Sequence, residues 1–236
     1  MEEKARGIVL GGVNFGESDK ILKIFTLEKG VVSAKIKGVK KAGAKLKFAS
    51  EPFCLVEFIF SVSSGRRTII GASLIDSFYP VREDIEKYFS ASVVLEFNKL
   101  FLPENILSEE MFLLSINTLK ELAYGEKPLK SAVAQFLISA LKISGYALNF
   151  ASCLDCGCEI KGRIFFNFMS GGFCCEKCFQ NNGREINYST FKALRKIEKG
   201  ENLTSYDSLP ALKLLAFYIA NRLEENIKSL NELIKM

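Results

Sequence analysis

The sequence has 236 residues, 48% of them hydrophobic, a formal net charge of +5 and no histidine. This composition is sufficient for a buried core and excludes a chain dominated by disorder. The absence of histidine removes the side chain most often used as a general base near neutral pH, together with all Ser-His and Cys-His nucleophile pairs. We therefore expect a protein that is not an enzyme.

The apolar segments and the cysteines predict the compartment. Runs such as 54–60 and 133–141 are interrupted before the roughly 18 to 20 residues that a membrane span needs, so we expect no membrane association. The first six residues lack the pattern of a secretory signal. Six of the seven cysteines fall between Cys153 and Cys178, which favours a metal site in a reducing compartment over a disulfide framework. Together these features predict a cytoplasmic protein.

The first 80 residues predict a small β-barrel. Five short apolar segments separated by glycine-containing turns are expected as strands, at 6–10, 20–26, 31–39, 53–62 and 66–75. Five strands in so short a stretch fit a closed barrel of the oligonucleotide-binding (OB) type, although the pattern equally permits an SH3-like barrel. We predict an OB-fold nucleic-acid-binding domain over residues 1–80.

The positive charge is concentrated in this first domain. Residues 1–80 hold 13 Lys and Arg against 8 Asp and Glu, whereas residues 81–236 hold 19 of each sign. The stretch 29–50 contains seven lysines and no acid. Such a field attracts a polyanion through counterion release, but a lysine-rich loop that only confers solubility remains an alternative.

Six phenylalanines in this domain are candidates for stacking against nucleic-acid bases. They are Phe15, Phe25, Phe48, Phe53, Phe58 and Phe60. Most are expected in the core instead, because Phe58 and Phe60 share the face of their strand with Cys54 and Val56.

Beyond residue 80 the apolar spacing changes to that of helices. Helices are predicted over 81–102, 108–124, 128–144, 189–198 and 210–235, each with an apolar stripe broad enough to require packing against its neighbours. We expect one helical bundle, which makes residues 81–236 a helical domain with an insertion at about 150–183. No phosphate-binding GxxxxGK[ST] loop is present.

The insertion carries two CxxC motifs with the spacing of a zinc ribbon. Cys153 and Cys156 are separated by 18 residues from Cys175 and Cys178, and four thiolates complete a tetrahedron around one structural Zn²⁺. A strand over 163–169 and a turn at 170–172 would place the motifs at the tip of a hairpin. Cys158 and Cys174 are expected to be spare thiols. A redox-active pair is the alternative, because CxxC is also the motif of thiol oxidoreductases.

These motifs together resemble the bacterial recombination mediator family RecO. The resemblance rests on Ala5-Arg6-Gly7-Ile8-Val9-Leu10, Phe15-Gly16-Glu17-Ser18-Asp19-Lys20, Lys37-Gly38-Val39-Lys40-Lys41 and Glu51-Pro52-Phe53, then on 153–157 and 171–178. It implies an OB barrel, a helical domain and a zinc element. It also implies binding of single- and double-stranded DNA, annealing of complementary strands, and cooperation with RecR to load RecA onto strands coated by single-stranded-DNA-binding protein at the nucleoid.

The resemblance also assigns the DNA-binding residues. In the family the corresponding strand and loop are basic, which here transfers to Arg6, Lys35, Lys37, Lys40, Lys41, Lys45 and Lys47. Lysine lacks the bidentate fork of arginine, so phosphate contact is expected without planar stacking on bases. The alternative from another class is a zinc-ribbon accessory factor that contacts RNA or protein.

Overall fold

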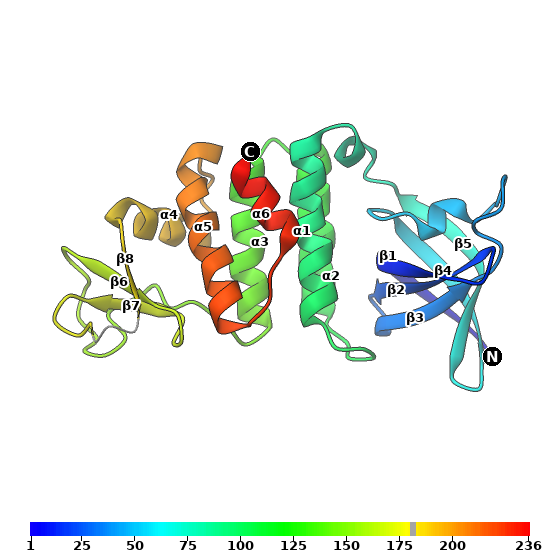
Figure 1. Ribbon diagram of the computed structural model, residues 1–236, viewed down its shortest axis with the longest axis horizontal. Helices are drawn as coiled ribbons and strands as arrows, with labels where there is room; N and C mark the ends of the chain where they lie inside the picture. Colours follow the sequence, from blue (N-terminus) through cyan, green and yellow to red (C-terminus); the bar gives the residue numbers. More distant parts are fainter. Residues whose placement is uncertain (180–182) are drawn as a thin grey trace. The chain divides into compact units, whose positions relative to one another are not determined.

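A computed structural model describes residues 1–179 and 183–236. The chain divides into two compact units, Met1–Tyr124 and Gly125–Met236 (Figure 1). We predicted domains over residues 1–80 and 81–236. These are domains of the sequence, whereas the two units are groups of residues in mutual contact, so the predicted domain boundary stays a prediction. None of the described helices is long and apolar enough to cross a membrane.

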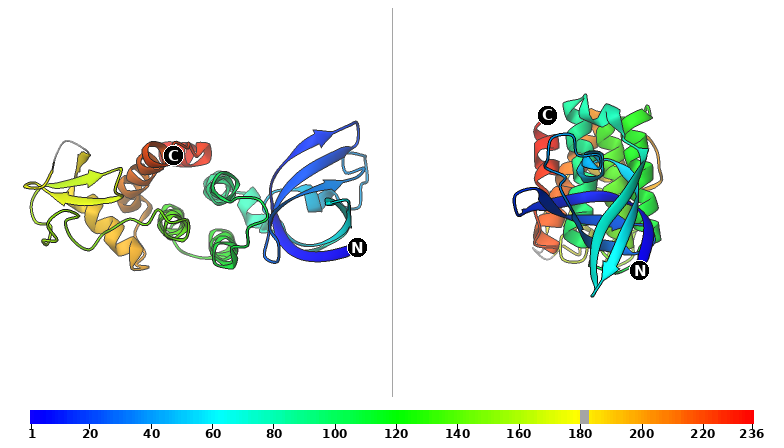
Figure 2. Two further views of the ribbon diagram at one scale, coloured as in Figure 1. Left: turned by 90° about the horizontal axis from the view of Figure 1, so that it is seen from below. Right: turned by 90° about the vertical axis from the view of Figure 1, so that its right-hand side faces the viewer.

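The first unit contains a closed five-stranded barrel (Figures 1 and 2). Its strands are β1 (Glu2–Phe15), β2 (Asp19–Thr26), β3 (Gly30–Ile36), β4 (Leu55–Ser63) and β5 (Arg66–Asp76), in the order β1-β2-β3-β5-β4. β1 pairs with both β2 and β4, and β3 runs parallel to β5. This order is that of the OB fold and decides against the SH3-like alternative.

Alternation of the side chains fills the barrel. Val32, Ala34 and Ile36 on β3 point inward with Val56, Phe58 and Phe60 of β4, while Ser33 is exposed and Lys35 is half-buried between them. The predicted inward face of β4 is thereby confirmed.

Several strand boundaries differ from the prediction, among them the ends of β1 and β3. β1 continues through Gly11 and Gly12 to Phe15, because a bulge at Leu10 shifts the register and both glycines then pair with β2. β3 ends at Ile36 rather than at residue 39, and Gly38 then adopts a φ of +65° that turns the chain away from the sheet.

The remainder of the first unit is helical. The 3₁₀ turns η1 (Lys47–Ser50) and η2 (Tyr79–Arg82) flank the last two strands, and α1 (Ile85–Phe101) packs against α2 (Glu109–Tyr124). Asp84 caps α1 by accepting a hydrogen bond from the Lys87 N–H, so the helix begins later than predicted. The buried Asn98 amide donates to Ser115 Oγ at 2.7 Å and joins the two helices.

The described residues of the second unit include four helices. α3 (Leu129–Ile143) packs against α5 (Ser205–Arg222), and α5 also contacts α4 (Tyr188–Glu198) and α6 (Lys228–Lys235) (Figure 1). The single helix predicted over 210–235 is wrong, because the chain leaves helical geometry after Arg222 and Glu224 has a φ of +56°. Pro210 lies within the first turns of α5, whose start at Ser205 the prediction missed.

A three-stranded sheet of β6 (Ile164–Asn167), β7 (Gly172–Cys175) and β8 (Arg184–Ile186) completes this unit, in the order β7-β6-β8. Its apolar face packs on the helices through aromatic pairs. Phe173 meets Phe191 of α4 edge-on at 4.8 Å between ring centroids, and Phe166 meets Tyr218 of α5 at 5.7 Å. The face of the sheet that carries Phe166 and Phe173 is therefore the one that packs against α4 and α5.

Candidate nucleic-acid interface and metal centre

The lysine-rich segment between β3 and β4 is an ordered succession of turns. We call residues 37–47 the basic loop. The Lys41 N–H donates to Gly38 O at 3.1 Å, and the Lys47 N–H donates to Ala44 O at the same distance. Buried Val39 anchors the loop to the barrel core between two exposed lysines. The backbone of the loop is thus folded even though its side chains face solvent.

Asp19 braces this loop from the first residue of β2. Its Oδ1 accepts the Gly38 N–H at 2.8 Å, and its Oδ2 lies 2.9 Å from Lys35 Nζ. The hydrogen bond from Gly38 and the ion pair with Lys35 lower the pKa of Asp19 to about 2. The Lys40 N–H also donates to Ser18 O at 3.0 Å, so the β1–β2 turn and the basic loop are joined at two points.

Five of the predicted DNA-binding residues lie on the basic loop with free charges. Lys37, Lys40, Lys41, Lys45 and Lys47 are all exposed, and none of them forms an ion pair within the described part of the chain. Cations held on a folded backbone without carboxylate partners are available to phosphate oxygens.

The other two predicted residues, Arg6 and Lys35, already have partners. Arg6 Nε lies 2.8 Å from Glu28 Oε1, and the Arg6 N–H donates to Glu28 Oε2. Lys35 pairs with Asp19 and also lies over the ring of Phe15, 4.4 Å from its centroid. Their charges are balanced locally, unlike those of the basic loop.

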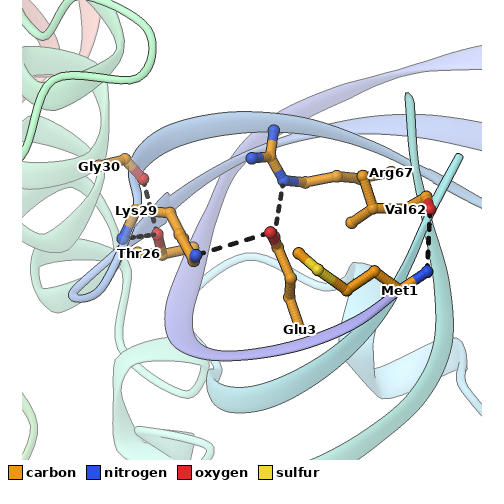
Figure 3. A network of polar contacts seen from close by, with 7 residues as sticks. All are labelled: Met1, Glu3, Thr26, Lys29, Gly30, Val62 and Arg67. Carbon is orange, nitrogen blue, oxygen red and sulfur yellow. Dashed lines mark hydrogen bonds and ion pairs between the residues drawn. The ribbon is translucent and has the colours of Figure 1, made fainter. Parts of the chain in front are cut away.

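Two further cations of the barrel are held by one carboxylate (Figure 3). Glu3, whose side chain is 12% exposed, lies 3.6 Å from Lys29 Nζ and 3.4 Å from Arg67 Nε. Beside it the N-terminal ammonium donates to Val62 O at 3.3 Å. Lys29 is therefore, like Lys35, a member of the seven-lysine stretch that pairs with a carboxylate of the barrel.

Most of the aromatic candidates belong to the core, as expected. Phe25, Phe53, Phe58 and Phe60 are fully buried, and Phe48 packs partly against the core. Phe15 is 49% exposed and stands at the end of β1 beneath Lys35, which is a geometry suited to stacking on a base. Sequence reasoning missed Arg66, an exposed cation at the β4–β5 turn; the Ser-Gly turn before it was the available signal.

The two CxxC motifs bring four thiols together. The Sγ atoms of Cys153, Cys156, Cys175 and Cys178 all lie within 4.8 Å of one another. The Gly157 N–H donates to Cys153 O at 2.9 Å, and the Cys178 N–H donates to Cys175 O at 3.1 Å, so each motif forms a tight turn. Gly157 has a φ of +70°, which the first turn requires and which glycine adopts without strain.

The arrangement of these sulfur atoms fits a tetrahedral zinc ion. Zn–S bonds of about 2.3 Å place the corners of a tetrahedron about 3.8 Å apart. The Sγ atoms of Cys156 and Cys175 are 3.8 Å apart. Burial opposes ionisation of Cys153, but backbone N–H donors from Cys156, Cys175 and Asp155 outweigh it and lower its pKa to about 6. Cys153 can therefore supply a thiolate ligand.

The spare thiols lie around this cluster. Cys174 lies beside the cluster, with its Sγ 3.4 Å from Asp155 Oδ2. Burial and that carboxylate raise the pKa of Cys174 to about 12, which keeps the thiol protonated. Cys153, Asp155 and Cys174 form a second close group, but it offers two thiols and shares Cys153 with the first. Four thiolates form the more suitable zinc site.

The position of the cysteines on the hairpin differs from the prediction. Cys175 ends β7 and pairs with Ile164 at the start of β6, so the thiols lie at the open end of the hairpin. The turn that joins β6 to β7 lies at the other end. The first CxxC motif comes to this end because the Leu154 N–H donates to Phe173 O at 2.9 Å along the outer edge of β7.

Comparison with known proteins identifies the family. The model "Recombination protein O N terminal" matches residues 1–78, and "Recombination protein O C terminal" matches residues 82–231. The chain belongs to the RecO family. The "DNA repair protein RecO" of Acetivibrio thermocellus is 30% identical over 97% of this chain and 94% of its own length. That of Caldicellulosiruptor saccharolyticus is 31% identical over 97% of the chain and 96% of its own length.

Membership of the RecO family confirms the resemblance inferred from the motifs. The OB barrel, the helices and the cysteine hairpin confirm the predicted fold class. The individual DNA-binding and metal-binding assignments stay predictions.

Proposed function

We propose that the protein acts in recombinational DNA repair as a mediator without catalytic chemistry. In this role it binds single- and double-stranded DNA, anneals complementary strands, and with RecR helps to load RecA onto strands coated by single-stranded-DNA-binding protein. The observation that carries the proposal is the basic loop of a RecO-family OB barrel, with five exposed lysines that have no carboxylate partner among the described residues. A nucleoid location follows from this substrate.

The chemistry is electrostatic. Lysines of the basic loop neutralise phosphates, release counterions and reduce the repulsion between two strands, so that base pairing proceeds without nucleotide hydrolysis. Each ammonium is a point charge, which favours contact with any sequence over readout of base edges. Affinity is expected to fall steeply as the salt concentration rises.

Arg6 and Lys35 play a smaller part in this proposal. To contact a phosphate, Arg6 must leave the carboxylate of Glu28, and Lys35 must leave that of Asp19. An exposed ion pair has little energy of its own, so the exchange is accessible, but its net gain is smaller than that of a free lysine.

We also propose that Cys153, Cys156, Cys175 and Cys178 hold one Zn²⁺ whose role is structural. Four protein ligands leave no open coordination position for substrate or water. The ion would fix the open end of a hairpin whose strands are too short to hold themselves.

Charge reversal on the basic loop tests the DNA-binding proposal. Replacing Lys37, Lys40 and Lys41 together by Glu is expected to abolish binding of a single-stranded oligonucleotide at moderate salt, and strand annealing with it. A matched variant with Lys99, Lys120 and Lys142 replaced by Glu carries the same net charge and is expected to bind normally. Fluorescence anisotropy and an annealing time course measure both.

Two outcomes would overturn the proposal. Unchanged affinity in the basic-loop variant would remove the loop from the interface. Preference for RNA over matched DNA, without annealing, would instead support the accessory-factor interpretation. RecA filament assembly on coated DNA, with and without RecR, tests the mediator step.

A further inference from the structure

A groove between α4 and α5 in the second unit has no role in the function proposed so far. It encloses about 850 Å³, which lies within the range of ligand-binding sites. Residues from the first turns of both helices line it, together with exposed side chains further along each helix.

The groove is strongly positive. Lys192 and Lys196 reach it from α4 and Lys213 reaches it from α5, and all three are exposed. None of the three forms an ion pair with a described residue. Among the described lining residues Asp207 is the one acid, and it is occupied at the start of α5, where its Oδ2 accepts from Thr204 Oγ1 at 2.7 Å.

Neutral hydrogen-bond donors face the same space. Thr190 lines the groove, is 7% exposed, and makes no hydrogen bond to any described residue through its hydroxyl. It belongs to the first turn of α4, whose N-cap residue Asn187 makes no side-chain capping bond. An unpaired hydroxyl and uncapped N–H groups beside three ammonium groups are donors from which phosphate oxygens accept hydrogen bonds.

An aromatic side chain stands at the rim. Tyr206 lines the groove and is 86% exposed, an uncommon state for so large a ring. A free aromatic face beside cations is the usual platform for a nucleic-acid base. An acidic peptide would pair with the lysines, but it would cover the ring only through an aromatic or proline side chain of its own, whereas every nucleotide carries a base.

We propose that this α4–α5 groove binds the sugar-phosphate backbone of a second nucleic-acid strand, with Tyr206 stacking on one of its bases. The inference rests on the proposed function, since it adds a second strand to the one held by the basic loop. Two separate phosphate-binding surfaces on one chain would let it hold both partners of an annealing reaction.

The test uses a single-stranded hexanucleotide and the full-length protein at low salt. The wild-type chain is expected to bind two hexanucleotides, and the variant with Lys192→Gln and Lys213→Gln is expected to bind one. Annealing of longer complementary strands should slow about tenfold in this variant. The logarithm of the affinity at the groove should fall with the logarithm of the salt concentration, with a slope of about 0.7 for each phosphate neutralised. A matched variant, Lys120→Gln with Lys142→Gln, should keep both sites and the wild-type annealing rate.

The basic-loop variant separates this proposal from the one on which it rests. With Lys37, Lys40 and Lys41 replaced by Glu, one hexanucleotide should still bind, at the groove. If the wild-type chain binds a single hexanucleotide that this variant loses, the groove proposal is wrong while the proposed function stands. If the wild-type chain binds none, both are wrong. Binding of an acidic hexapeptide in place of the hexanucleotide, abolished in the groove variant, would assign the groove to a protein partner instead.

Discussion

The barrel and the cysteine hairpin stabilise their exposed segments in different ways. The barrel closes five strands of 7 to 14 residues around a continuous core, so it can carry a loop of five exposed lysines that Asp19 braces and Val39 anchors. The two strands of the hairpin have four residues each, and β8, which completes the sheet, has three. Strands this short gain little from pairing, and a bound ion replaces the missing core at their open end.

The inner part of the hairpin is held differently from its thiol end. Phe166 and Phe173 pack against Tyr218 and Phe191 of the helices. At the edge of β7, a Cβ on Gly172 would lie 2.7 Å from the Leu154 side chain, so the first CxxC motif approaches the strand closely. Loss of the ion should therefore free the thiol end and leave the helices intact.

The largest expected effect comes from breaking the thiol cluster. Cys153→Ser removes the most deeply buried of the four thiols, and zinc content measured by mass spectrometry should fall from one ion per chain to a small fraction. Structural zinc sites contribute on the order of 10 kcal/mol to the folding of small zinc-finger peptides, so the segment around both CxxC motifs should become sensitive to proteolysis. The barrel should keep its thermal transition and its affinity for DNA.

Cys158→Ser is the matched control for that experiment. Cys158 is exposed and lies outside the group of four, so this variant should retain one zinc ion and resist the protease. Full zinc content in Cys153→Ser would contradict the assignment.

A smaller effect is expected from breaking the barrel at its β2–β3 turn. Gly30 has a φ of +68°, and a Cβ there would lie 2.1 Å from Ile106 O in the α1–α2 connection. Gly30→Ala should therefore lower the free energy of unfolding of the first unit by at least about 2 kcal/mol, from backbone strain plus displacement of that connection. Urea unfolding measures the change, and the zinc content should stay unchanged.

Gly16→Ala separates the two contributions. Gly16 has a φ of +64° but nothing within 4 Å of its Cβ position, so this variant carries the strain without the displacement. If both variants lose the same free energy of unfolding, the close contact between the added Cβ and Ile106 O does not contribute to the loss in Gly30→Ala.

The sequence predicted those parts of the molecule that depend on local patterns. Alternation from Val31 to Ile36 located β3, and the two CxxC motifs located the four thiols, because each pattern acts through neighbours along the chain. Contacts between segments far apart in the sequence could not be predicted from such patterns. Nothing near Arg6 indicates its pairing with Glu28, 22 residues away, which decides how much of its charge is free.

The same limit applies to the interfaces between elements. The α4–α5 groove brings together Lys192 of α4 and Lys213 of α5, and their separation in sequence gives no sign of this. The break between α5 and α6 was missed because the apolar spacing continues from Leu223 to Ile227 while the backbone turns at Glu224. The spacing of apolar residues indicates which residues are buried. The same spacing can continue where the backbone changes direction, so it does not show where one helix ends and the next begins.

The smallest expected effect is a pH dependence of the basic loop, and it tests whether one carboxylate is sufficient to brace it. The hydrogen bond from Gly38 and the contact with Lys35 lower the folded pKa of Asp19 from 3.8 to about 2. Because the folded pKa is depressed, the contribution of Asp19 to stability is complete above about pH 4 and is lost as the pH falls through about 2. The Gly38 amide should therefore shift in NMR spectra and exchange faster with solvent over that interval. In Asp19→Asn this transition should disappear, and the loop should be equally mobile at pH 6. If the Gly38 amide of the wild type instead titrates near 4, Asp19 does not hold the loop, and its order comes from the turns, from Val39 and from the hydrogen bond between Lys40 and Ser18.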